Sequence, residues 1–76
     1  MTVYTKGQRV NTNLGPGVII GFERFDANGM TAPLSDVDVE GSRSRVEVEL
    51  DDPSRWAFPK EKYGNPYIYR DEMSPE

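Results

Sequence analysis

The chain of 76 residues contains neither cysteine nor histidine. Without cysteine, no disulfide or thiolate-bound metal can supplement the core, and without histidine the usual zinc sites and the common neutral-pH proton shuttle are excluded. A domain of this length buries only about 60% of the surface that its unfolded chain exposes. We therefore expect no metal or cofactor, and a fold that rests on the packing of a few large apolar side chains.

Long apolar segments are missing as well. No apolar run approaches the length that spans a membrane, and the chain does not open with the basic and then apolar segments of a secretory signal. We therefore expect a soluble, cytoplasmic protein without membrane contact. No repeat or low-complexity segment divides residues 1–76, which are expected to form a single domain.

Positive charge is scarce overall but unevenly distributed. Thirteen acidic residues against nine basic ones give a net charge of −4, which disfavours tight, non-specific binding to a phosphate backbone. Residues 26–52 hold eight acids and two arginines, whereas residues 53–70 hold four basic residues and one acid. An acidic segment is thus followed by a basic one.

Residues 6–22 predict a β-hairpin. Val10 lies between the polar residues Arg9 and Asn11, as in a strand with one buried face. The second strand has apolar residues at alternate positions, namely Val18, Ile20 and Phe22. This strand is expected to end at the polar Glu23.

Proline and glycine predict the turn of this hairpin and an irregularity after it. Pro16 and Gly17 fit the central positions of a type II turn, because proline sets φ at the first position and glycine accepts positive φ at the second. Gly21, in the middle of the second strand, predicts a β-bulge or a close approach of two backbones.

The remaining residues predict long loops and short strands. Residues 26–44 lose the apolar alternation and are predicted to form a loop, in which Val37 and Val39 are candidates for a short extra strand. Residues 45–51 give the cleanest strand pattern, with valine, valine and leucine on one face and charged residues on the other. A short last strand is expected at residues 67–70, followed by a 3₁₀ turn that packs Met73 inward.

Several of these features occur in the same order in a known family. They are Gly7 and Val10 before the first turn, the glycine turn, the strand at residues 45–51 and the closing segment from Glu72 to Pro75. In this order they resemble the SH3-like barrels of the KOW and Tudor type, apart from insertions at residues 26–44 and 52–66. The resemblance implies an all-β fold: a small SH3-like barrel of about five antiparallel strands that acts as a binding module. The chain also resembles, more weakly, small proteins encoded in phage and prophage genomes, which implies an accessory role.

Aromatic and basic residues in the C-terminal half have the types that grip a peptide or stack on bases. We hypothesise that another protein binds there, and the candidate contact residues are Trp56, Tyr63, Tyr67, Tyr69, Met30 and Leu34. For Trp56 and Phe58, packing in or at the rim of the core is favoured over a ligand surface, because large apolar residues are scarce. Tyr67 and Tyr69 face outward if Ile68 faces inward.

Two other hypotheses concern nucleic acid and self-association. In the nucleic-acid alternative, the aromatic residues stack on bases and the phosphates are contacted by Lys6, Arg9, Lys60, Lys62 and Arg70. Binding of this kind should weaken sharply with salt. In the third hypothesis, an exposed edge strand pairs with a second copy of the chain.

Nothing in the sequence predicts catalysis. No serine or threonine has a histidine to activate it, no glycine-rich phosphate loop is present, and the acidic residues lack the spacing of a calcium loop. Glu47 and Glu49 are expected to be a solvated pair whose pKa values nothing apolar perturbs, on the outer face of one strand. The acidic residues also allow the interpretation of a surface that mimics DNA. We therefore expect a non-catalytic interaction module.

Overall fold

The computed structural model describes residues 4–25, 31–35 and 45–76. Its elements are β1 (Arg9–Thr12), β2 (Gly15–Phe25), β3 (Thr31–Ser35), β4 (Val46–Leu50), the 3₁₀ turn η1 (Pro53–Arg55), α1 (Lys60–Tyr63), β5 (Tyr67–Ile68), the 3₁₀ turn η2 (Arg70–Glu72) and β6 (Met73–Pro75). The strands form one antiparallel sheet in the order β5-β4-β2-β1-β6, and β3 pairs with β2 outside this path. The prediction of an all-β fold with about five antiparallel strands is confirmed.

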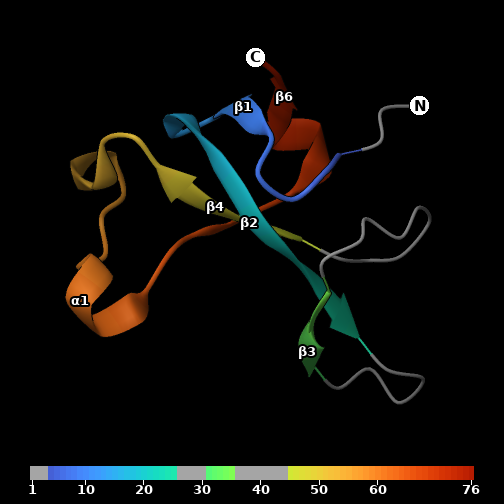
Figure 1. Ribbon diagram of the computed structural model, residues 1–76. Coiled ribbons are helices and arrows are strands. Elements are labelled where there is room, and N and C mark those ends of the chain that lie inside the picture. The colour runs from blue at the N-terminus through green and yellow to red at the C-terminus, as the bar shows by residue number, and fades with distance from the viewer. Residues whose placement is uncertain (1–3, 26–30, 36–44) are drawn as a thin grey trace.

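The long strand β2 organises the sheet and runs through the whole molecule in Figure 1. Its first half lies between β1 and β4, where Val18 pairs with Arg9 on one side and with Glu49 on the other. Its second half lies between β4 and β3, with Phe22 next to Val46. The pairings among the described strands do not join β5 to β6, so they form an open path and not a closed barrel.

A β-bulge interrupts the pairing of β2 with β4. Ile19 pairs with Val48 and Gly21 pairs with Glu47, which leaves Ile20 as an extra residue on β2. Such a bulge bends the strand and increases its twist. The bulge that was predicted at Gly21 is confirmed.

This bulge changes which residues of β2 face the core. Ile19 and Phe22 are both fully buried although they are three positions apart, whereas Val18 and Ile20 are only half-buried. The predicted alternation of Val18 and Ile20 with Phe22 is therefore wrong. One extra residue moves every side chain that follows it to the opposite face of a strand.

The turn between β1 and β2 lies earlier than predicted. Thr12 pairs with Gly15, and the Thr12 hydroxyl accepts a hydrogen bond from Leu14 N (3.0 Å) and donates one to Gly15 O (2.8 Å). Gly15 has a φ of 99°, a conformation that favours glycine. Pro16 and Gly17 belong to β2, so the type II turn predicted there is wrong.

Gly17 is required for a different reason. A Cβ atom at this position would lie 2.6 Å from the carbonyl oxygen of Glu49 and 2.7 Å from Cγ1 of Val48. Strands β2 and β4 thus approach too closely for any side chain here.

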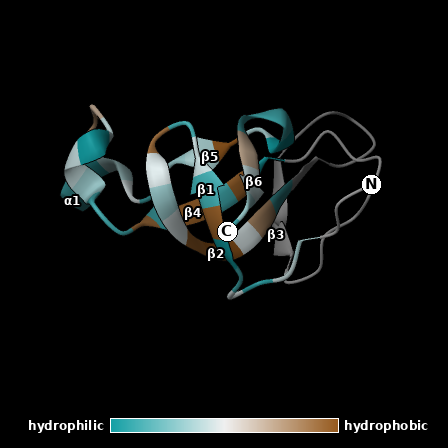
Figure 2. Ribbon diagram, turned by 90° about the horizontal axis from the view of Figure 1, so that it is seen from above, coloured by the Kyte–Doolittle hydropathy of each residue, from teal (hydrophilic) through white to brown (hydrophobic). Residues whose placement is uncertain are grey.

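One face of the sheet forms the hydrophobic core. Its buried apolar residues come from the N-terminal segment and five of the strands, and they are Tyr4, Val10, Ile19, Phe22, Val46, Val48, Leu50, Ile68 and Met73. Figure 2 shows the apolar residues concentrated on the strands, whereas α1 is largely polar. The core face predicted for residues 45–51 is confirmed.

Strand β3 occupies part of the segment that was predicted as a loop. It pairs with the end of β2, and the register shifts between Phe22 and Arg24. Pro33 lies in β3 opposite this shift, where a missing N–H group is tolerated. The extra strand predicted at Val37 and Val39 lies outside the described residues.

The C-terminal elements differ in part from the prediction. Strand β5 has only two residues, because Tyr69 already precedes the 3₁₀ turn η2. That turn and the inward packing of Met73 are confirmed. Strand β6, which pairs with β1, was not predicted because three residues that include Pro75 carry no strand signal.

Candidate functional site

Residues 53–64 leave the sheet as a separate segment, which lies to one side of the strands in Figures 1 and 2, and the chain rejoins the sheet at Pro66, whose carbonyl oxygen accepts a hydrogen bond from Val48 N (3.1 Å). Asp52 caps η1 by accepting hydrogen bonds from the backbone N–H (3.2 Å) and the hydroxyl (2.6 Å) of Ser54. Helix α1 starts after Pro59 and ends at Gly64, whose φ is 72°. No residue of η1 or α1 is buried. Local caps, and not burial of the helices, therefore shape this segment.

Three rings in this segment form what we call the aromatic ladder: Trp56, Phe58 and Tyr63. The ring centroids of Trp56 and Phe58 are 5.3 Å apart, and those of Phe58 and Tyr63 are also 5.3 Å apart. Both contacts are edge-to-face, a favoured arrangement for aromatic pairs. Each ring thus supports the next.

The ladder is anchored at one end and exposed at the other. Trp56 is half-buried and packs against the core, as predicted. Phe58 and Tyr63 are 52% and 51% exposed. The favoured core or rim packing is therefore wrong for Phe58, because its ring stands on Trp56 and faces solvent.

Two lysines of α1 lie in the same segment as the ladder. Lys62 Nζ lies 5.4 Å from the centroid of the Tyr63 ring, and Lys60 Nζ lies 4.0 Å from Glu49 Oε1. Both partners of the second pair are well exposed, and exposed pairs at such a distance contribute little. The Lys60 ammonium group therefore remains available to another carboxylate.

The cavity beside the ladder is too small for a ligand. It has a volume of about 10 Å³ and is lined in part by Leu50, Trp56, Lys60 and Pro66. This volume is about that of one water molecule. The ladder therefore presents exposed rings without a ligand-sized cavity beside them.

Tyr67 and Tyr69 form a second, separate site on the outer face of the sheet. They are 37% and 57% exposed, and Ile68 between them is 3% exposed, so the predicted orientation of these three side chains is confirmed. The guanidinium carbon of Arg45 lies 5.2 Å from the Tyr67 ring centroid and 5.9 Å from that of Tyr69. The guanidinium group of Arg45 thus already makes cation–π contacts with both rings.

Arg45 is held in place by Glu23. Its Nε and Nη2 atoms donate hydrogen bonds of 2.7 Å and 2.8 Å to the two carboxylate oxygens of Glu23, whose side chain is only 6% exposed. These hydrogen bonds raise the pKa of Arg45. Glu23 was predicted to end its strand, but β2 continues to Phe25. A glutamate is stable in this buried position because its charge is paired in bidentate geometry.

The outer face of the sheet near Tyr67 is partly shielded from solvent. Burial raises the pKa of Glu47, and a hydrogen bond with Asn65 opposes this effect. Burial also raises the pKa of Tyr67. The expectation that nothing would perturb the pKa of Glu47 is therefore wrong. Sequence reasoning missed its partners because Asn65 and Tyr67 reach it only through the pairing of β4 with β5.

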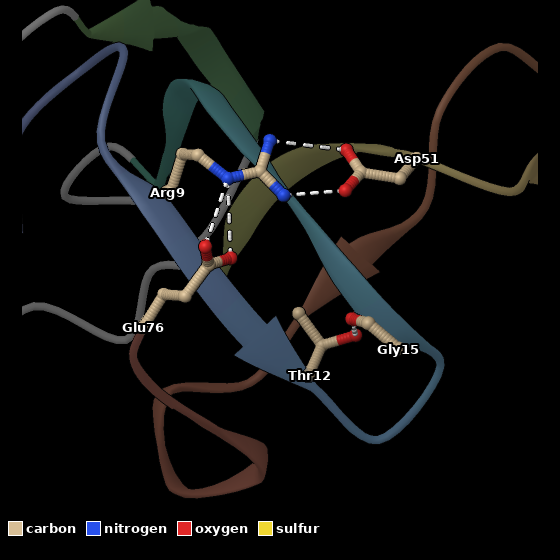
Figure 3. A network of polar contacts seen from close by, with 5 residues as sticks. All are labelled: Arg9, Thr12, Gly15, Asp51 and Glu76. Atoms are coloured by element: carbon tan, nitrogen blue, oxygen red, sulfur yellow. Dashed lines mark hydrogen bonds and ion pairs between the residues drawn. The ribbon is translucent and has the colours of Figure 1, made fainter.

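The cations proposed for phosphate contact come from different elements, and one of them is already paired. Arg9 Nε donates to both carboxylate oxygens of Glu76 at 3.1 Å, and Nη1 donates to Asp51 Oδ1 at 3.2 Å, as Figure 3 shows. Two carboxylates thus neutralise Arg9, and the hydrogen bond from Arg9 lowers the pKa of Asp51. Lys6 precedes β1 and Arg70 begins η2, so both lie outside the segment that carries the two lysines of α1.

For two candidate contact residues the structure gives no side-chain position. Met30 lies outside the described residues, and for Leu34 the structure describes the backbone alone, in β3. Within residues 4–25, 31–35 and 45–76, no group of three or more histidine, cysteine or acidic side chains could hold a metal. No helix in these ranges is long and apolar enough to cross a membrane.

Comparisons with protein-family models, with curated proteins and with solved structures find no match. A function can therefore be inferred only from the geometry of the described residues. Of the predicted contact residues, the structure brings Trp56 and Tyr63 together through Phe58, and it brings Tyr67 and Tyr69 together around Arg45.

Proposed function

We propose that this protein is a non-catalytic interaction module that binds another protein through the aromatic ladder. The observation that carries this proposal is the exposure of Phe58 and Tyr63, at 52% and 51%, on a stack anchored to the core by Trp56. Exposed, well-supported aromatic rings are the residues that contribute most to protein interfaces. They also lose little conformational entropy on binding, because they have only two rotatable side-chain bonds.

The backbone around the ladder supports the same proposal. Pro59 and Gly64 set the two ends of α1, and the Asp52 cap sets the start of the segment. A contact surface that is ordered before binding costs less to immobilise. The ladder therefore has the preorganisation that a recognition site requires.

A second part of the proposal concerns the type of fold. We propose that the sheet is a partly open SH3-like barrel of the KOW or Tudor type, encoded by a phage or prophage. The single sheet of antiparallel strands supports the all-β part of this proposal. Barrels of this kind serve many unrelated binding functions, so the surface and not the fold has to indicate the partner.

Selection from a random peptide library tests the binding function. The wild-type protein should enrich related peptides, and the double variant Phe58→Ser with Tyr63→Ser should lose them. Tyr69→Ser is the matched control, since Tyr69 is 57% exposed but lies near Arg45, outside the ladder. Loss of enrichment with Tyr69→Ser alone would move the proposed site to the Arg45 surface.

Nucleic acid is the second candidate, because Lys62 lies beside the exposed Tyr63 ring and Lys60 lines the small cavity next to Trp56. Fluorescence anisotropy with labelled single-stranded and duplex oligonucleotides, at low and at physiological salt, separates the two functions. A steep loss of affinity with salt indicates phosphate contacts, whereas apolar contact with a protein depends little on salt. The pairing of Arg9 with two carboxylates favours the protein partner.

A further inference from the structure

The segment that carries the ladder has a charge opposite to that of the protein. Residues 53–66 contain Arg55, Lys60 and Lys62 against Glu61, so three positive charges and one negative charge leave +2, whereas the whole chain carries −4. Figure 1 shows η1 and α1 on the far side of β4 from β1 and β6. Lys60 and Lys62 thus lie in the same segment as the exposed rings, whereas the Arg55 side chain lies beside Gly15 at the turn between β1 and β2.

We propose that the ladder and its two lysines bind an acidic segment of a partner protein, one that carries an aromatic or branched aliphatic anchor. This inference rests on the proposed protein-binding function and specifies the chemistry of the partner. Complementary charge steers the encounter and selects among partners, and the apolar anchor supplies affinity.

The apolar anchor would lie against the exposed rings. Phe58 and Tyr63 meet edge-to-face at 65°, and together they present an apolar surface that Trp56 supports from below. Covering rings that are half exposed removes apolar area from water. The absence of a deep cavity beside Trp56 makes a flat or branched side chain a better fit than a long one.

The acidic residues of the partner would lie over α1. Lys62 is already oriented toward the ladder, with its ammonium 5.4 Å from the Tyr63 ring centroid. Lys60 is 4.0 Å from Glu49, and both side chains are substantially exposed. A partner carboxylate can replace Glu49 at little cost, because an exposed ion pair at this distance is weak.

The surroundings of the segment favour a short acidic peptide over nucleic acid. Glu49 and Asp52 border the ladder segment and are exposed. Charges interact over about 8 Å at physiological ionic strength. A duplex extends much further than this and would bring phosphates close to both carboxylates, whereas the acidic residues of a short peptide can be confined to the lysines.

Fluorescence anisotropy with labelled peptides tests the inference on the whole protein. The probe is a short peptide of aspartate and glutamate around a central phenylalanine and leucine. Its control has asparagine and glutamine in place of every acid. The acidic peptide should bind more tightly than the neutral one, and the difference should shrink as salt is raised.

Matched variants then assign the effect to the ladder segment. Lys62→Gln should weaken binding of the acidic peptide about two- to fivefold and leave the neutral peptide unchanged. Lys6→Gln removes the same charge before β1 and should leave both affinities unchanged. Phe58→Ala should weaken both peptides about fivefold or more. Circular dichroism spectra that match the wild type show that each variant is folded.

The inference and the proposed function fail in different ways. If library selection enriches neutral or basic peptides that need Phe58 and Tyr63, the binding function stands and the acidic partner is excluded. If no peptide is enriched, both proposals fall. Tighter binding of oligonucleotides than of the acidic peptide would overturn the inference in favour of nucleic acid. Self-association in sedimentation velocity that Lys62→Gln abolishes would instead identify a second copy of the chain as the ligand.

Discussion

The sheet and the aromatic ladder use the same residue type in opposite ways. Phe22 in β2 is fully buried between neighbouring strands, whereas Phe58 in the ladder is 52% exposed. A small domain has few large apolar side chains, so each exposed one reduces the hydrophobic stabilisation that is available. The comparison shows that stability is concentrated in the sheet, while the ladder leaves apolar surface free for contact.

The two regions also differ in how they are held. Five strands of the sheet share one core cluster, and backbone pairing links them in a continuous path. Residues 53–64 depend on the Asp52 cap, on Pro59 and Gly64 at the ends of α1, and on Trp56 as the anchor. We therefore expect mutations in the sheet to act globally and mutations in the ladder to act locally.

Replacement of the two phenylalanines should give the largest contrast. Phe22→Ala creates a cavity in the core and should destabilise the protein by about 3–5 kcal/mol. Phe58→Ala should cost less than about 1 kcal/mol, because it removes ring contacts at the surface. Urea denaturation followed by circular dichroism measures both. Equal losses would show that the ladder is part of the cooperative core.

Two glycines extend the comparison to the backbone. Gly17→Ala places a methyl group against the backbone of β4 and should destabilise the protein by about 2–3 kcal/mol. Gly64→Ala meets no atom within 4 Å, but its φ of 72° strains any other residue. This strain can be relieved by local opening of α1, so global stability should change by less than about 1 kcal/mol. The same urea experiment measures both, and a larger loss for Gly64→Ala would reverse the comparison.

Removal of the anchor should separate the two regions. Trp56→Ala should cost about 1–2 kcal/mol in global stability, since the side chain is only half-buried. The amides of Tyr63 and Gly64, which donate to Pro59 O (3.0 Å) and Lys60 O (2.8 Å), should lose protection from hydrogen exchange. The amide of Ile19, which donates to Gln8 O (3.0 Å), serves as the control and should stay protected. Uniform loss of protection would contradict a separate segment.

The smallest effect should come from the ion pairs around Arg9 and should depend on pH. The hydrogen bond from Arg9 lowers the pKa of Asp51 from its usual value of 3.8. A carboxylate with a lowered folded-state pKa stabilises the fold above its unfolded pKa, and this contribution is lost as the pH falls through the folded value. Arg9→Gln should therefore lower the thermal midpoint at neutral pH, and the difference should vanish in acid.

The ionised carboxylate of Glu47 should affect stability in the opposite direction to that of Asp51, so Glu47 serves as the control for this measurement. Burial raises its pKa from the usual 4.5, so its carboxylate destabilises the fold above that pH, and the penalty is relieved as the pH falls through the folded value. Glu47→Gln should raise the thermal midpoint at neutral pH and leave it unchanged in acid. The same direction for both variants would exclude this account of the outer face.

Local sequence patterns correctly predicted several features of the fold that depend on one strand or one turn. The alternation in residues 45–51 correctly indicated which valines of β4 are buried, and Ile68 correctly indicated the outward direction of its two tyrosine neighbours. Gly21 correctly indicated the bulge, but not that Ile20 would be the extra residue. A bulge forms between two paired strands, so the sequence of one strand does not determine which residue is left unpaired.

The candidate site was predictable in composition but not in arrangement. Aromatic and basic residues in the C-terminal half indicated a contact surface, and Trp56 and Tyr63 are in the ladder. Two features could not be read from the sequence: the exposure of Phe58, and the stacking of Arg45 on Tyr67. The stacking of Arg45 depends on the pairing of β4 with β5, and the exposure of Phe58 depends on how η1 and α1 place the three rings, and both arrangements form only in the folded chain.

The sequence by itself determined an all-β protein without disulfides, with β4 as a half-buried strand and with a 3₁₀ turn that places Met73 in the core. These features follow from local periodicity and turn chemistry, which act over a few residues. The tertiary structure decided that Gly17 serves a close approach of strands and that Glu23 is a buried partner of Arg45. Their physical causes are steric exclusion and charge pairing across neighbouring strands, and neither exists until those strands meet.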